Sequence, residues 1–87
     1  MIIKYGNNLG GNKMITTEIF INDFKALLSI NAEITLDTDL LDIDEWDSFS
    51  AMSFLAMIEE KYGIKVEPFA IAEAILVEDL YEIVKNN

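Results

Sequence analysis

The feature that most constrains the fold is the segment 48–62, SFSAMSFLAMIEEKY, which predicts one helix with clear ends. Asp47 before it is a favourable N-cap residue, and Gly63 after it suits the left-handed conformation that ends many helices. At 100° per residue, one face of this helix predicts the stripe that packs against a core. The stripe consists of Ala51, Phe54, Leu55, Ile58 and Tyr62.

The opposite side of the same segment is also apolar. It holds Phe49, Met52 and Ala56, with Glu59 and Glu60 beside them. The core of a small domain covers only one face of a helix. We therefore expect these three residues to be exposed, or to be covered by another molecule.

Three further segments predict helices around the same core. Segment 17–29 carries apolar residues at helical spacing, with Thr16 or Thr17 as its N-cap. A brief helix at 69–74 follows Pro68, a residue that the first turn of a helix tolerates. A last helix at 77–85 turns four side chains inward: Val77, Leu80, Tyr81 and Val84. The sequence therefore predicts an all-α fold, a small four-helix bundle whose third helix is short.

Residues 30–47 lack a sustained helical or strand period and predict a long loop between the first two helices. Loops of this length are uncommon in small domains. Six apolar side chains are spaced along it, and we expect them to hold it onto the core as an ordered loop with one short turn: Ile34, Leu36, Leu40, Leu41, Ile43 and Trp46.

The first thirteen residues differ from the rest of the chain. They hold three of the four glycines and no acid, and we expect residues 1–13 to form a flexible leader before a domain at 14–87. Two origins stay open for this leader. It is either an ordinary N-terminal tail, or a translated upstream region, in which case the native chain begins at Met14.

Composition excludes several classes of function. The chain has 87 residues and a net charge of −10, which opposes binding to nucleic acid and to anionic membranes. It has no Cys and no His, and so lacks thiolate nucleophiles, imidazole bases and the commonest ligands of transition metals. No apolar run has the length of a membrane span, and we expect a cytoplasmic monomer.

The acidic loop suggests calcium binding at first sight, but its spacing does not fit an EF-hand. A loop begun at Asp37 would need Gly at position 42 and Glu at position 48, and the register begun at Asp42 also fails. We therefore assign no metal site. Catalytic residues are not assigned either, because a small bundle has little room for a cleft and Ser48 has no nearby base in sequence.

Ser48 allows two interpretations from its position alone. In the first, the Asp47–Ser48 pair only initiates a helix. In the second, the Ser48 hydroxyl at the helix N-terminus carries a phosphate, which the helix dipole and free backbone N–H groups would stabilise.

The segment 46–66, WDSFSAMSFLAMIEEKYGIKV, resembles the second helix of the acyl carrier proteins. In that family, an Asp-Ser pair precedes an amphipathic helix, a Glu-Glu pair and a short I-x-V or I-x-I stretch. The segment 72–84, AEAILVEDLYEIV, resembles the third and fourth helices of the family, with its V-x-D-L pattern. The resemblance covers about residues 15–85, and the long loop is also a feature of the family.

This resemblance implies that Ser48 carries a covalent 4′-phosphopantetheine arm, transferred from coenzyme A by a phosphopantetheinyl transferase. The arm holds an acyl group as a thioester, so the chain itself is a carrier and not an enzyme. Asp47 is implied to be recognised together with Ser48. The docking surface for acyl-loading and acyl-transfer enzymes with basic patches is implied to comprise Phe49, Met52, Ala56, Glu59 and Glu60.

Some positions depart from the fatty-acid-synthesis carriers. Ser50 and Ser53 replace usual acids, Leu76 replaces a usual threonine cap, and Trp46 precedes the Asp-Ser pair. These departures are typical of specialised stand-alone carriers. Two alternatives stay open: an aminoacyl or peptidyl carrier, although those more often have Gly before the serine, and an unmodified helical adaptor that binds a partner through Phe49 and Met52.

Overall fold

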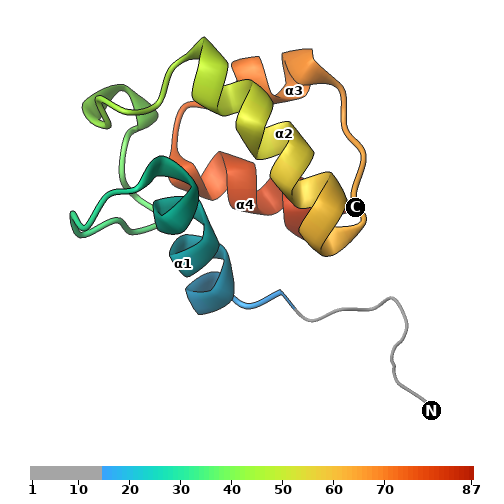
Figure 1. Ribbon diagram of the computed structural model, residues 1–87, viewed down its shortest axis with the longest axis horizontal. Helices are drawn as coiled ribbons and strands as arrows, with labels where there is room; N and C mark the ends of the chain where they lie inside the picture. Colours follow the sequence, from blue (N-terminus) through green and yellow to red (C-terminus); the bar gives the residue numbers. More distant parts are fainter. Residues whose placement is uncertain (1–14) are drawn as a thin grey trace.

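The computed structural model describes residues 15–87, and these residues form a helical bundle without a strand (Figure 1). The elements are α1 (Thr17–Leu28), the 3₁₀ helix η1 (Leu40–Asp42), α2 (Ser48–Tyr62), α3 (Pro68–Ala72) and α4 (Val77–Lys85). The predicted all-α bundle with a short third helix is confirmed. The expected leader, residues 1–13, lies outside the described residues.

The ends of the helices follow their capping residues. Thr16 caps α1 by accepting a hydrogen bond from the Ile19 N–H (3.1 Å), and α1 ends one residue earlier than predicted, because Ser29 adopts the left-handed conformation (φ 57°). Gly63 ends α2 in the same conformation, as predicted (φ 72°). The third helix, predicted at 69–74, instead begins at Pro68 and ends at Ala72.

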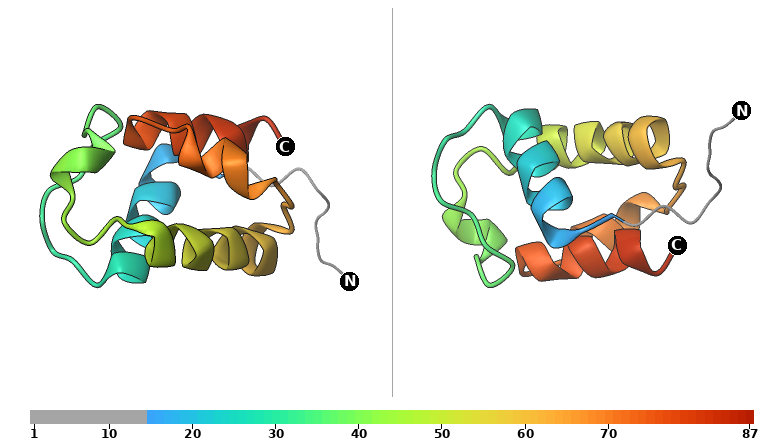
Figure 2. Two further views of the ribbon diagram at one scale, coloured as in Figure 1. Left: turned by 90° about the horizontal axis from the view of Figure 1, so that it is seen from above. Right: turned by 90° about the horizontal axis from the view of Figure 1, so that it is seen from below.

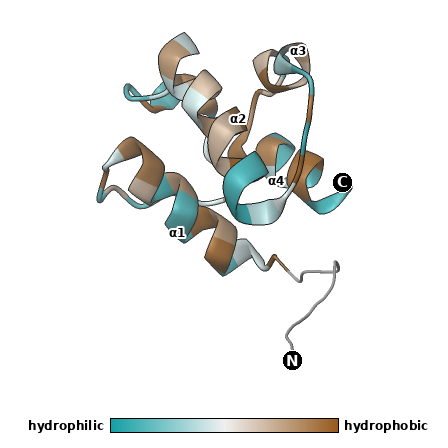
Figure 3. Ribbon diagram, turned by 45° about the vertical axis from the view of Figure 1, so that its right-hand side comes forward, coloured by the Kyte–Doolittle hydropathy of each residue, from teal (hydrophilic) through white to brown (hydrophobic). Residues whose placement is uncertain are grey.

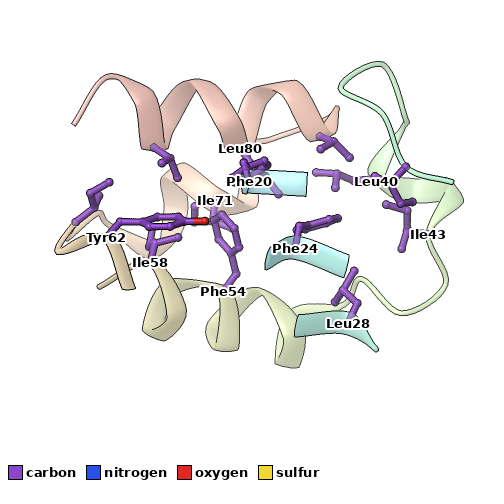
Figure 4. Packing of buried hydrophobic residues seen from close by; sticks show 14 residues of the cluster. Phe20, Phe24, Leu28, Leu40, Ile43, Phe54, Ile58, Tyr62, Ile71 and Leu80 are labelled. Carbon is purple, nitrogen blue, oxygen red and sulfur yellow. The ribbon is translucent and has the colours of Figure 1, made fainter. Parts of the chain in front are cut away.

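The core is centred on three buried phenylalanines from two helices (Figure 4). The Phe54 ring of α2 meets Phe20 and Phe24 of α1 edge-on, with ring centroids 6.0 and 6.2 Å apart. Such edge-to-face pairs are favourable beyond the burial of their area. Of the face of α2 predicted to pack against the core, Phe54, Ile58 and Tyr62 are buried, while Ala51 and Leu55 lie half-buried at its margin.

The long loop, residues 30–47, closes one end of the bundle, and the C-terminus lies at the other end (Figure 2). The prediction of an ordered loop with one short turn is confirmed by η1. Ile34, Leu40 and Ile43 are buried, as expected. The prediction for Leu41 is wrong, since its side chain is 89% exposed. A 3₁₀ helix has three residues per turn, so consecutive leucines point about 120° apart and only Leu40 faces the core.

Backbone hydrogen bonds tie this loop to the start of α4. Three bonds of 2.9 Å do so: Leu40 N–H to the Ile75 carbonyl, Val77 N–H to the Thr38 carbonyl, and Glu78 N–H to the Leu36 carbonyl. The first N–H groups of a helix have no partner inside it, and Leu76 has no side-chain acceptor to cap them. The loop therefore supplies part of the cap of α4.

Helices α1 and α2 are joined by a polar contact at the edge of the core. The Asp23 carboxylate accepts a hydrogen bond from the Tyr62 hydroxyl (2.7 Å) and pairs with the Lys61 ammonium (3.1 Å). Burial raises the pKa of Tyr62, and the hydrogen bond to Asp23 raises it further. Tyr62 therefore stays protonated and remains a donor at physiological pH.

We predict that Tyr62→Phe lowers the free energy of unfolding by about 2 kcal/mol, because hydrogen bonds to charged groups are stronger than neutral ones. Tyr81→Phe is the matched control, since its hydroxyl donates to the neutral carbonyl of Ile15 (3.0 Å), and it should cost about 1 kcal/mol. Urea denaturation measures both values. Equal losses in the two variants would show that the charge on Asp23 does not strengthen the bond.

Candidate functional site

Ser48 is the first residue of α2, and its side chain is exposed. Asp47 before it is the N-cap, as predicted: its carboxylate accepts a hydrogen bond from the Ser50 N–H (2.9 Å). In return, the Ser50 hydroxyl accepts one from the Asp47 N–H (2.8 Å) and donates one to the Asp47 carbonyl (3.1 Å). The two residues form a reciprocal capping box around the Ser48 backbone.

The part that Ser50 plays in this box was not predicted. From the sequence, Ser50 was only a serine in place of a usual acid, whereas in the structure the residue is 9% exposed and its side chain belongs to the cap. The spacing Asp-x-x-Ser was the available signal, because N-cap and third helical position are the two members of a capping box.

The cap also sets the electrostatics beside Ser48. The hydrogen bond from the Ser50 N–H is the largest cause that lowers the pKa of Asp47, and it outweighs the partial desolvation of the carboxylate. The charged cap therefore contributes stability above the ordinary pKa of 3.8, and this contribution is lost as the pH falls through the lowered value.

The capping box reduces the number of backbone N–H groups that are free to bind a phosphate on Ser48. The Asp47 carboxylate already occupies the Ser50 N–H. A phosphate at this position would therefore meet the positive end of the α2 dipole without the Ser50 N–H.

Trp46 fixes the end of the loop two residues before Ser48. Its ring lies 5.6 Å from Phe24 and 5.9 Å from Phe54, measured between centroids, and its backbone N–H donates to the Ile43 carbonyl (3.0 Å). The sequence showed Trp46 as a departure from related carriers. In the structure, it connects the site to the aromatic core, so that Ser48 follows a well-anchored residue.

The apolar side of α2 lies where the helical projection predicted. Phe49 and Met52 are 80% and 56% exposed, and Ala56 is exposed as well. We call these three residues the α2 stripe; most of α2 is brown in Figure 3, where hydrophobic residues have that colour. Glu59 and Glu60 are exposed further along the helix, and Glu59 pairs with Lys65 (3.5 Å).

Among residues 15–87, no group of three or more acidic side chains is arranged to hold a metal ion. No helix in this range is long and apolar enough to cross a membrane.

The chain matches a known protein family. The family model described as "Phosphopantetheine attachment site" matches residues 18–84. This range runs from the second residue of α1 to the last residue but one of α4. The chain belongs to this family. Comparisons with curated proteins and with solved structures gave no match.

Membership identifies the chain as a carrier that bears covalently attached 4′-phosphopantetheine and is not itself an enzyme. Carrier domains are modified by phosphopantetheinyl transferases and interact with partner enzymes. The resemblance to the acyl carrier protein family, given above from the sequence, is thereby confirmed.

We predict that Ser50→Ala lowers the free energy of unfolding by about 1 kcal/mol, because it leaves the Asp47 N–H without its partner. Ser53→Ala is the control. Ser53 lies in the same helix beyond the capping box, and its replacement should change stability by less than about 0.5 kcal/mol. Urea denaturation at neutral pH measures both. Similar effects in the two variants would contradict the role of Ser50 in the cap.

Proposed function

We propose that this chain is an acyl carrier protein that holds an acyl group as a thioester on a 4′-phosphopantetheine arm attached to Ser48. The observation that carries the proposal is the position of Ser48 inside the matched range 18–84: an exposed hydroxyl at the first residue of α2, directly after Asp47.

The attachment needs little from the chain beyond that hydroxyl. The Ser48 oxygen forms a bond to a phosphorus atom of the coenzyme A pyrophosphate, and the bond from that phosphorus to the bridging oxygen breaks. The nucleotide part leaves, and the hydroxyl proton passes to a base of the transferase. Since the chain has no His, a base supplied by the partner is consistent with its composition. The arm brings its own thiol, which fits a chain without Cys.

An acyl cargo is favoured over an aminoacyl cargo by Asp47. Aminoacyl and peptidyl carriers more often have Gly before the serine, and a glycine has no carboxylate with which to cap α2 as Asp47 does. The departures at Ser50, Leu76 and Trp46 support a specialised stand-alone carrier over one of fatty acid synthesis. The runner-up functions are an aminoacyl or peptidyl carrier and an unmodified adaptor.

We further propose that the α2 stripe, with Glu59 and Glu60, docks onto basic patches of partner enzymes. Exposed apolar residues beside acidic ones suit such a contact, in which charge speeds the encounter and the apolar residues stabilise the complex. The acidic chain disfavours nucleic acid as a partner.

The first experiment tests the attachment. The protein is incubated with coenzyme A, Mg²⁺ and a broad-specificity phosphopantetheinyl transferase, and its intact mass is measured. We expect the wild type to gain one phosphopantetheine and Ser48→Ala to gain none. Ser53→Ala, in the same helix, should be modified as the wild type is. A wild type without mass gain, or a gain that persists in Ser48→Ala, would refute the proposed site.

The second experiment tests docking. We predict that Met52→Glu slows the modification roughly tenfold, a loss of about 1.4 kcal/mol in the transition state, because it places a charge within the α2 stripe. The fold should persist, since Met52 is largely exposed. Asn22→Glu adds the same charge on an exposed position of α1 and should be modified at nearly the wild-type rate. If Met52→Glu unfolds the domain, Met52 belongs to the core and the assignment is wrong.

A further inference from the structure

Two of the large hydrophobic residues exposed in the described part of the chain lie outside the α2 stripe and close to each other in the fold. Leu41 of η1 is the most exposed of the group, and Ile75, just before α4, is 63% exposed. Their backbones are neighbours, because the Leu40 N–H donates to the Ile75 carbonyl (2.9 Å). We call Leu41 and Ile75 the loop patch.

Both residues are held in place by carboxylates. The Asp39 carboxylate accepts a hydrogen bond from the Leu41 N–H, and the Asp79 carboxylate accepts one from the Ile75 N–H, each at 2.9 Å. An isolated bridge between Asp39 and Leu76 joins the two segments further. A single exposed apolar residue needs no explanation. Two of them on neighbouring backbones, each fixed by its own hydrogen bond, form a defined surface.

The charge around the loop patch indicates what kind of molecule fits it. Between positions 26 and 60 the chain has nine acids and no lysine or arginine, and Asp42 is exposed directly beside Leu41. η1, which contains Leu41, and the start of α4, which follows Ile75, lie at the end of the bundle where α2 begins (Figure 2). An apolar contact in an acidic surrounding complements a basic protein surface with apolar side chains at its centre.

We propose that the loop patch is a second contact surface for the phosphopantetheinyl transferase, used together with the α2 stripe when Ser48 is modified. This inference rests on the proposed function of Ser48. The occupant is a partner enzyme with a basic surface next to its active site. Because loop and α4 are joined by backbone bonds, the patch presents a fixed geometry to the enzyme and loses little conformational entropy on binding.

The test compares modification kinetics of the double variant Leu41→Ser/Ile75→Ser with those of the wild type, using a broad-specificity phosphopantetheinyl transferase, coenzyme A and Mg²⁺. We expect kcat/KM to fall roughly tenfold in the double variant, with the same final mass as the wild type. Ile19→Ser, an exposed apolar residue on α1, is the matched control and should stay within about twofold of the wild type.

A second variant tests the charge of the partner without removing the apolar pair. Asp42→Lys should slow modification and make the rate less sensitive to added salt, because an attraction to a basic surface is screened by ions. Asn22→Lys is its control on α1, and circular dichroism checks that all variants keep the helical content of the wild type.

The outcomes separate this inference from the proposed function. If the wild type gains no phosphopantetheine, both are overturned. If the wild type is modified and the double variant reacts equally fast, only the loop patch is refuted. Sedimentation measures the oligomeric state of both proteins. If the wild type dimerises and the double variant is monomeric, the loop patch binds a second copy of the chain, and the proposal is overturned.

Discussion

The arrangement of the site depends on the hydrogen bonds between the long loop and the first turn of α4. The carbonyls of Leu36 and Thr38 accept hydrogen bonds from the first N–H groups of α4. The side chain of Leu76, the N-cap residue, has no acceptor for these groups. These bonds satisfy the start of one helix and at the same time fix a loop that has little regular structure of its own. Because the loop is fixed, Trp46 reaches the aromatic core, and the chain enters α2 at Ser48 from an anchored position.

Helix α2 has a second constraint, which links the fold to its proposed use. Phe54, Ile58 and Tyr62 occupy the interior, and α1 and α3, which pack against α2, leave its opposite face uncovered. Phe49 and Met52 consequently face solvent, although both would gain free energy from burial. The chain retains apolar residues at a position where its own core does not cover them. Their exposure next to Ser48 is consistent with selection for binding, which stability alone does not explain.

The sequence was sufficient for features that depend on local rules. Asp47 and Gly63 marked the ends of α2 because caps act on adjacent residues, and the helical projection separated its two faces correctly. Features that depend on distant residues were missed. The hydrogen bond between Leu40 and Ile75 joins backbone groups 35 positions apart, and the sequence of neither segment predicts that they pair. Leu41 was assigned to the core as one of six apolar residues of the loop, and only the 3₁₀ geometry of η1 separates it from the buried Leu40.

Charge is distributed along the bundle in a way that favours one orientation of approach. The cations of the chain after residue 60 are Lys61, Lys65 and Lys85, and they pair with Asp23, Glu59 and Glu82 respectively. They lie at or just after the C-terminal ends of α2 and α4, which are at the end of the bundle opposite the loop (Figure 2). The acids of the loop have no cation among their sequence neighbours. A partner enzyme with a basic surface, as proposed above, would therefore meet the strongest attraction at the end that carries Ser48. Exposed ion pairs at the far end add little stability, so their main consequence is that they weaken the field there and leave the acidic end dominant.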